Sequence, residues 1–221
     1  TIAMIEISVE KENLNPKILK ENVKVIENQA EKTYVMVQEI NSLFKEREIK
    51  PVPTDLNILV SHILEVCASN FGDDIEINGQ LYDVQAINNV DPIFLEIALM
   101  NICENAFQAM TIMRSESERR EGILEVSIQK IFPDRNYRQI HPQAIASSYW
   151  IISVADNGVG ISDESYPRIF DPFFTTKEKY KAVGLGLTVA NEIIRQHKGF
   201  IEVYTEVGNG SDFSIFLPDI N

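Results

Sequence analysis

The chain has 221 residues, with 20 Lys and Arg against 33 Asp and Glu, which gives a formal net charge of −13 at pH 7. This acidic balance excludes a general nucleic-acid-binding role, because affinity for a phosphate backbone requires clustered basic side chains. A hydrophobic content of 44% and a charged content of 24% are ordinary for a globular protein of one or two domains.

The first 48 residues carry the pattern of a helical hairpin. Ile2, Ile5 and Val9 are typical of the end of one helix. Asn15 and Pro16 supply a cap and a first-turn proline for a second helix, expected over about 16–48. Apolar or small positions along this helix alternate in steps of four and three, with one polar exception at Thr33: Leu19, Val23, Ile26, Ala30, Val37, Ile40 and Phe44.

This seam is too narrow to stabilise an isolated hairpin, so two copies are expected to pair into a four-helix bundle, which predicts a homodimer. The alternative is a single helix packed on its own domain. The sequence has no run of about 18 apolar residues and no signal peptide, so we expect a cytoplasmic location without membrane contact. Because it starts with Thr1 rather than Met, we expect a longer parent protein, which could be membrane-anchored.

A second domain is expected over about 54–221, after a linker marked by Pro51 and Pro53. Helices are expected from 55 to about 67, over 91–113 and over 187–197, and strands over 75–82, 84–88, 123–131, 149–155, 200–205 and 211–217. The long connection over 132–148 is typical of an insertion. Cys67 and Cys103 fall in apolar helical patterns and are expected to be reduced core thiols. This order predicts an α/β fold, a two-layer sandwich of a mixed sheet with helices on one face.

Asn101 and Asn105 are four residues apart in the helix expected from Asp91, so they share a helix face. Asparagine is a poor residue within a helix, and a stacked pair suggests a role. A side-chain amide oxygen is a neutral hard ligand that suits Mg²⁺, which usually bridges to substrate phosphates. For this pair alone, exposed asparagines without a role remain the alternative.

Asp156 follows the strand over 149–155 and precedes Gly158 and Gly160. Glycines at these positions permit positive φ and close approach of the backbone. An ordinary turn is the simpler interpretation of such a sequence. A buried aspartate at this strand end could also accept a hydrogen bond from an exocyclic amine, such as that of adenine.

Gly184 and Gly186 lead directly into the third helix, and free amides at a helix start form an anion site. Upstream lie the aromatic stretch 170–177, Lys179 and Lys181, whose charge could offset the repulsion between a polyphosphate and an acidic chain. A solvated charged loop is the alternative for these lysines. The spacing matches neither a Walker loop nor a Rossmann fingerprint.

Taken in order, these four blocks resemble the catalytic, ATP-binding half of a sensor histidine kinase, in the superfamily shared with gyrase, heat-shock chaperone and mismatch-repair ATPases. The resemblance covers about Asp55 to Asp219, and the helix before it resembles the second helix of the family's dimerisation and phosphotransfer hairpin. It implies a Bergerat-type ATP site, ATP and Mg²⁺ as cofactors, and a response-regulator receiver domain as partner.

The resemblance also implies residue roles. Asn105 is the implied Mg²⁺ ligand, with Asn101 as a second candidate, and Asp156 receives the adenine amino group. Lys177 joins the two asparagines in the implied catalytic set. The other implied site residues belong to the adenine turn, to a flexible lid over 162–186 and to the last hairpin: Gly158, Gly160, Phe170, Gly184, Gly186, Leu187, Gly208, Gly210, Ser211 and Phe213.

Asn101 bears on the type of reaction. Members of the superfamily that hydrolyse ATP place a glutamate one turn before the Mg²⁺ asparagine, where it can act as a general base. Asparagine at this position disfavours water activation and favours transfer to a histidine, which needs mainly positioning and Mg²⁺. The family's acceptor pattern is missing, and the three histidines present, His62, His141 and His197, are interpreted as packing or surface, loop and helix-end residues. The acceptor is therefore expected upstream of Thr1.

The expected function is transfer of the γ-phosphoryl group of ATP to a histidine outside this sequence and then to a response-regulator aspartate. One alternative is an ATP-driven conformational switch of the gyrase or chaperone kind. The other is a non-enzymatic dimeric scaffold that sequesters a regulator.

Overall fold

The fold is known from a computed structural model that describes residues 23, 24, 26, 49–72, 75–111, 113, 121–176 and 183–219. The chain divides into two compact units, 1–48 and 49–221. Val23, Lys24 and Ile26 are helical, and the rest of the predicted hairpin lies outside the described residues. Within the described part of the chain, no helix is long and apolar enough to cross a membrane.

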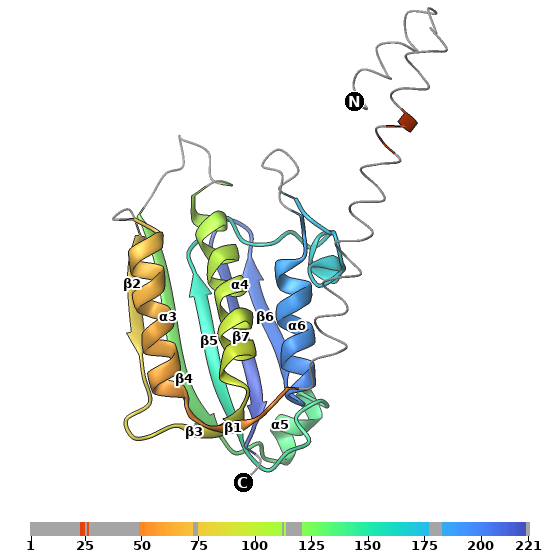
Figure 1. Cartoon of the computed structure of the whole chain (residues 1–221). Coiled ribbons are helices and arrows are strands. Elements are labelled where there is room, and N and C mark those ends of the chain that lie inside the picture. The colour runs from red at the N-terminus through yellow and green to blue at the C-terminus, as the bar shows by residue number, and fades with distance from the viewer. Residues whose placement is uncertain are drawn as a thin grey trace, which may run out of the picture. The chain divides into compact units, whose positions relative to one another are not determined.

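The second unit is built on a five-stranded mixed sheet with the order β2-β4-β5-β7-β6 (Figure 1). Its strands are β2 (Ile75–Gln80), β4 (Gly122–Ile131), β5 (Tyr149–Asp156), β6 (Phe200–Glu206) and β7 (Gly210–Pro218). Strand β2 is parallel to β4, and the other neighbouring pairs are antiparallel. The predicted mixed sheet is therefore confirmed.

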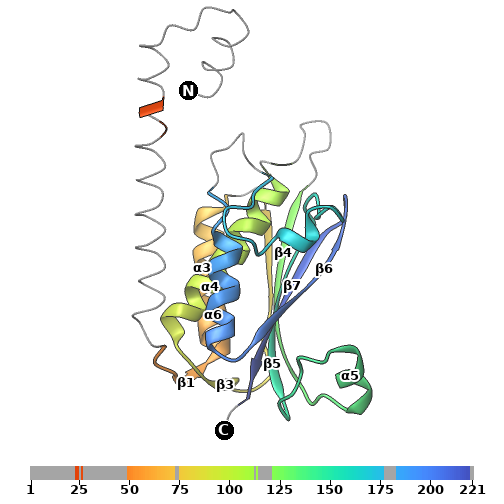
Figure 2. The ribbon, with the colours of Figure 1, turned by 90° about the vertical axis from the view of Figure 1, so that its right-hand side faces the viewer.

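Helices α3 (Leu56–Asn70), α4 (Pro92–Met110) and α6 (Gly186–Gln196) cover one face of this sheet (Figure 2). The core lies between the two layers. Ile152 and Val154 of β5 pair with Ile215 and Phe213 of β7, and all four are at most 1% exposed. The alternation of buried residues along each strand places this apolar set on the helix side. The predicted two-layer sandwich is confirmed.

Aspartate caps start two of these helices where the sequence predicts. The side chain of Asp55 accepts a hydrogen bond from the backbone N–H of Asn57 at the start of α3. The side chain of Asp91 accepts from the backbone N–H groups of Ile93 and Phe94 at the start of α4. Such caps satisfy amides that have no partner inside the helix. Helix α4 ends at Met110, three residues before the predicted end.

Pro51 lies between the boundary of the two units and the first strand, but the linker prediction is wrong at Pro53, which belongs to strand β1 (Val52–Asp55). It pairs antiparallel with β3 (Ile87–Val90) in a separate two-stranded sheet. Strand β3 is also displaced from the predicted range 84–88. Proline is tolerated in β1 because a strand with one neighbour needs hydrogen-bond donors on one side only.

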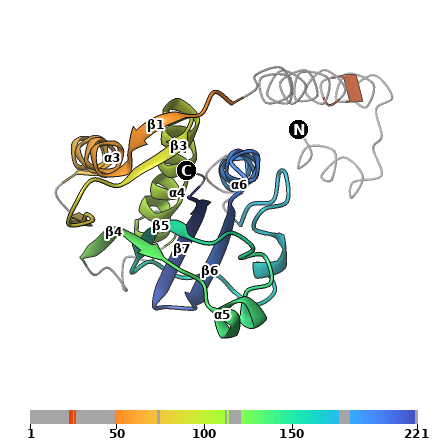
Figure 3. The same ribbon diagram turned by 90° about the horizontal axis from the view of Figure 1, so that it is seen from below.

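The predicted insertion over 132–148 contains a short helix, α5 (Arg135–Ile140), which lies across the sheet from α3, α4 and α6 (Figure 3). The prediction that all helices cover one face therefore holds for three of the four α-helices described in this unit. The insertion buries Tyr149, Ile151 and Phe216 beneath Ala144. Cys67 and Cys103 are buried and free, as predicted.

Replacing Ile63 by alanine is expected to lower the free energy of unfolding by about 2–5 kcal/mol, because Ile63 is 1% exposed and its loss leaves a cavity in the core. Ile58→Ala is the matched control in the same helix, where the isoleucine is 71% exposed, and is expected to cost less than about 0.5 kcal/mol. Chemical denaturation measures both. Equal losses would contradict the assignment of the buried side of α3.

Candidate functional site

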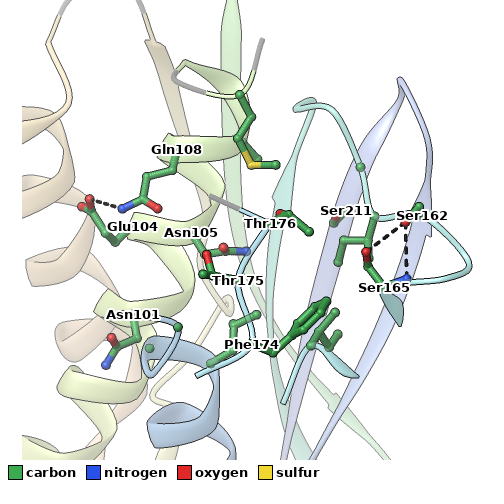
Figure 4. Close-up of a pocket in the computed structure, with 18 of the residues that line it drawn as sticks. Asn101, Glu104, Asn105, Gln108, Ser162, Ser165, Phe174, Thr175, Thr176 and Ser211 are labelled. Carbon is green, nitrogen blue, oxygen red and sulfur yellow. Dashed lines mark hydrogen bonds between the residues drawn. The ribbon is translucent and has the colours of Figure 1, made fainter. Parts of the chain in front are cut away.

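A cavity of about 520 Å³ opens between α4, the start of α6 and the loops that follow β5 (Figure 4). Its walls combine polar side chains of α4 with loop glycines and apolar side chains. The lining residues are Asn101, Glu104, Asn105, Gln108, Ala109, Met113, Gly160, Ile161, Ser162, Ser165, Ile169, Phe174, Thr175, Thr176, Val183, Gly184, Leu185, Gly186, Leu187, Val207 and Ser211.

Helix α4 supplies one wall through Asn101, Glu104, Asn105 and Gln108, at i, i+3, i+4 and i+7 of one helix face. In Figure 4 the side chain of Asn105 extends from α4 toward the strands, while Glu104 and Gln108 meet each other at the edge. Gln108 Nε2 donates to Glu104 Oε1 at 2.9 Å. The opposite side of α4 packs in the core, so this helix presents a polar face to the cavity from a fixed position.

The side chain of Asn101 is held between α4 and α6. Its Nδ2 donates to the carbonyl oxygen of Ile97 at 2.9 Å, one turn earlier. A β-carbon built on Gly186 would lie 2.9 Å from Asn101 Oδ1. Only glycine therefore fits at the start of α6 without displacing the Asn101 amide. The two asparagines of the predicted pair differ, because Asn101 contacts the start of α6 whereas Asn105 extends into the cavity.

Asp156 ends β5 and lies directly across the strand pair from Ser211 of β7, which lines the cavity. Both residues are 8% exposed. Asp156 Oδ1 accepts a hydrogen bond from the backbone N–H of Gly158 at 2.7 Å, which fixes the direction of the carboxylate. A side chain on Gly210 would overlap the carbonyl oxygen of Asp156, so glycine allows the last hairpin to close on this strand end.

The turn after Asp156 packs against the end of α4. The backbone N–H of Val159 donates to the carbonyl oxygen of Ala109 at 3.2 Å. A β-carbon on Gly158 would lie 2.8 Å from the β-carbon of Ala109, which lines the cavity. Asp156 and Gly158 themselves do not line it. They are buried beside Ser211 and Ala109, which do line it.

The described part of the predicted lid is anchored at Gly184, whose φ is +72°. The backbone N–H of Phe173 donates to its carbonyl oxygen at 3.0 Å, and Phe173 itself has a φ of +65°. Phe174 lines the cavity, and the guanidinium of Arg168 lies 4.4 Å from its ring centroid. This contact places the Arg168 guanidinium, which also pairs with the Asp171 carboxylate at 3.7 Å, beside the cavity wall.

The predicted site residues are only partly brought together. Seven of them line the cavity: Asn101, Asn105, Gly160, Gly184, Gly186, Leu187 and Ser211. Phe170 does not line it, and its carbonyl oxygen instead accepts from Thr188 Oγ1 of α6 at 3.1 Å. Lys177 lies outside the described residues.

Sequence reasoning did not identify Glu104 and Gln108 as lining residues, nor the role of Arg168, whereas Thr175 and Thr176 fall in the stretch 170–177 that it assigned to the lid. A signal for the first two was present, because Glu104 lies three residues after Asn101 and Gln108 lies three residues after Asn105, on the same helix face. The lid residues carry no comparable periodicity, so their side chains could not be assigned to the cavity from spacing.

The polar side chains of α4 suit a metal ion that takes few ligands from the protein and most of its ligands from water and a bound phosphate compound. Among the described residues, no group of three or more His, Cys, Asp or Glu side chains is placed to hold a metal. Asn105 instead offers one amide to the cavity, and the Glu104 carboxylate at its edge is bonded to Gln108. Mg²⁺ typically takes one or two protein ligands and fills its remaining positions with water and phosphate oxygens, so this wall is compatible with it.

The family model described as "Histidine kinase-, DNA gyrase B-, and HSP90-like ATPase" matches residues 90–221. "Sensor kinase CckA" of Brucella abortus (strain 2308) is 32% identical over 197 residues, which cover 87% of this chain and 20% of that protein. "Sensor histidine kinase ZraS" of Escherichia coli (strain K12) is 29% identical over 195 residues, which cover 88% of this chain and 37% of that protein. The chain thus spans between one fifth and two fifths of these curated relatives.

Solved structures of histidine kinases share the fold. Full-length ShkA in complex with AMPPNP superposes with a TM-score of 0.60 at 22% identity, covering 78% of this chain and 32% of that one. The nucleotide-free catalytic domain of the histidine kinase ThkA superposes with a TM-score of 0.59 at 21% identity, covering 76% of this chain and 95% of that one. The histidine kinase ThkA in complex with the response regulator protein TrrA superposes with a TM-score of 0.60 at 21% identity, covering 99% of this chain and 57% of that one.

Gly160→Ala is expected to destabilise the protein more than Gly208→Ala, although both glycines have positive φ, +70° and +84°. A side chain at Gly208 meets nothing within 4 Å, so the cost is the backbone strain of about 1–2 kcal/mol. At Gly160 it would overlap the carbonyl oxygen of Glu206, which adds about 1–3 kcal/mol. Denaturant unfolding of the two variants measures the difference, and a smaller loss for Gly160→Ala would refute this packing of the turn.

Proposed function

The chain belongs to the histidine kinase-, DNA gyrase B- and HSP90-like ATPase family, and on this basis we propose that it is the ATP-binding catalytic region of a sensor histidine kinase. It transfers the γ-phosphoryl group of ATP to a histidine, from which an aspartate of a response regulator receives it. The observation that carries this proposal is the cavity that Asn105 of α4 and the uncapped start of α6 line together.

The adenine end of the nucleotide is assigned to the end of β5. The Asp156 carboxylate is oriented by the Gly158 N–H, and it accepts a hydrogen bond from the exocyclic amino group of adenine. Ser211, its strand partner, lines the cavity and brings this strand end to the ligand. A buried carboxylate rejects a base that has a carbonyl at the same position, because two acceptors would then face each other without a proton.

The phosphate end is assigned to the start of α6. Leu185, the N-cap residue, makes no side-chain capping hydrogen bond, so the first amides of the helix are not consumed by a cap. The backbone N–H groups at Gly186 and Leu187 then favour an anion together with the helix dipole. Asn105 would hold the Mg²⁺ ion, which would supply positive charge to neutralise the phosphates. Lys177 adds a lid cation to the proposed catalytic set.

Transfer is favoured over hydrolysis by Asn101. An amide cannot accept a proton from water, and Asn101 Nδ2 is already bonded to Ile97 while its oxygen faces Gly186. A histidine nitrogen needs no such base, because its lone pair attacks the γ-phosphorus while the bond to the β,γ-bridging oxygen breaks and ADP leaves. The proposed reaction therefore needs positioning and charge neutralisation rather than proton abstraction.

The acceptor histidine is proposed to lie outside this sequence. Its three histidines are all described, and none lines the cavity. His62 is exposed on α3, His141 pairs with Glu202 in the insertion, and His197 is buried at the end of α6. We further propose that residues 1–48 are part of a dimerisation and phosphotransfer hairpin, that 54–221 is the ATP-binding domain, and that the cellular location is cytoplasmic.

The fate of γ-labelled phosphate tests the reaction. ATP and Mg²⁺ are given to the 221-residue chain and to a chain extended through any coding sequence that precedes Thr1. Acid-labile, base-stable label on the extended chain alone is the expected result. Free phosphate from both chains would point to the ATPase switch, and neither product, with ATP still bound, would point to the scaffold.

Asp156→Ala is expected to lower the affinity for ATP by at least about tenfold, to the point where binding is lost, because a buried adenine amine loses its acceptor. Asp212→Ala is the matched control on the next strand, where the carboxylate accepts from Ser153 Oγ at 2.6 Å. It is expected to leave ATP affinity within about twofold. Titration calorimetry measures both, with circular dichroism as the check on folding. Unchanged affinity in a folded Asp156→Ala variant would exclude this adenine site.

A further inference from the structure

His197 lies at a junction that the proposed reaction does not use directly. It ends α6 and is 7% exposed. Its Nε2 accepts a hydrogen bond from the backbone N–H of Asp91 at 2.9 Å, and its Nδ1 lies 2.8 Å from the carbonyl oxygen of Ile193. Both ring nitrogens are therefore engaged inside the protein.

These two partners determine the protonation of the ring. A backbone N–H can only donate, so Nε2 of His197 is the unprotonated nitrogen. A carbonyl oxygen can only accept, so Nδ1 carries the hydrogen. His197 is thus a neutral imidazole in the Nδ1–H tautomer, a state that an NMR measurement can identify.

Asp91, the partner of His197, connects three parts of the unit. Its Oδ1 accepts from the first amides of α4, at 3.2 and 3.3 Å. Its Oδ2 accepts at 2.9 Å from the backbone N–H of Lys50, the second residue of the unit. Its own N–H binds His197. One residue therefore joins the start of the unit, the start of α4 and the end of α6.

The cavity lies along the second half of α4 and at the start of α6, two helices that run side by side in Figure 1. Asn101 is ten residues after Asp91, and Leu187 is ten residues before His197, so each lies about 15 Å from the junction along its helix axis. At that level Asn101 Oδ1 meets Gly186. The two helices are thus antiparallel and fastened at one end, with the cavity at the other.

The end of α6 is also fixed against the sheet. The backbone N–H of Gly199 donates to the carbonyl oxygen of Ile194 at 2.9 Å. A side chain on Gly199 would overlap the carbonyl oxygen of Phe216 in β7, so the chain passes this strand at close contact. A helix held in this way transmits a shift at its end to its start, because helices in packed layers move as rigid elements.

We propose that His197 is a positioning residue for the nucleotide site. Its hydrogen bond to the Asp91 N–H sets the axial register of α6 against α4. This register fixes the distance from the amides at Gly186 and Leu187 to the two asparagines of α4. The part of the proposal that concerns ATP rests on the proposed function, whereas the register of the two helices does not.

Two variants that differ by one methylene test the proposal. His197→Gln places an amide oxygen at the position of Nε2 and is expected to keep ATP affinity within about twofold of wild type. His197→Asn is too short to reach the Asp91 N–H and leaves it unpaired, so ATP affinity is expected to fall about fivefold or more. Titration calorimetry well below the unfolding temperature measures both.

Asn57→Ala is the control for general destabilisation. Asn57 Nδ2 donates to the carbonyl oxygens of Tyr82 and Val84, and its Oδ1 accepts from the Tyr82 N–H, so the variant loses stability at a place apart from α4 and α6. It is expected to unfold at lower temperature with ATP affinity unchanged. A purely structural role of His197 predicts the same behaviour for His197→Asn.

NMR spectra without ligand separate the register from the function. The His197 ring is expected in the Nδ1–H tautomer, and His197→Asn is expected to shift the Gly186 amide and the Asn101 side-chain amide, unlike Asn57→Ala. An Nε2–H tautomer, or unshifted signals in His197→Asn, would overturn the proposal. Failure of the wild-type chain to bind ATP would refute the proposed function instead. The NMR signals without ligand would then still show whether His197 sets the register of the two helices.

Discussion

Helix α4 buries its apolar side against the sheet and presents its polar side to the cavity, and the geometry of the site depends on this arrangement. Its apolar side packs in the core through residues such as Leu95, Leu99 and Ile102. Its polar side carries the two asparagines, at helical spacing. Because the core fixes the rotation of the helix, the direction of the polar side is fixed as well. The Asp91 cap sets where the helix begins, and the turn at Gly158 packs against its other end.

In the proposed phosphate site, backbone groups take the place of many of the charged side chains that such a site usually has. The chain carries a net charge of −13, which repels a polyphosphate at long range. The start of α6 offsets this repulsion with amides that no side chain caps. Glycines at 184 and 186 let the chain pass close to the Phe174 backbone and to Asn101 without a steric clash. Fixed dipoles of this kind lose little on binding, because they are already oriented. The Arg168 guanidinium on Phe174 adds a cation within the described part of the lid.

Elements with strong periodicity or clear caps were predictable from the sequence, and elements that depend on tertiary contacts were not. Asp55 and Asp91 mark helix starts because their side chains bond to nearby amides, a local interaction. Strand β1 was missed because its prolines suggest a linker, and only its pairing with β3 makes it a strand. Likewise, spacing placed Asn101 and Asn105 on one face, but the contact with Gly186 that distinguishes them joins residues far apart in sequence. Asp156 was singled out by its turn, while its place beside Ser211 depends on strand register.

The central claim is that ATP occupies the cavity with adenine at the end of β5 and phosphates at the start of α6. Amide chemical-shift mapping of the 221-residue chain during titration with ATP, with and without Mg²⁺, tests it most directly. The account predicts the largest shifts at Gly158, Gly160, Gly184 and Gly186, with the Asn105 side-chain amide responding only when Mg²⁺ is present. Saturable binding of ATP with shifts confined to another surface, such as the face under α5, would contradict it.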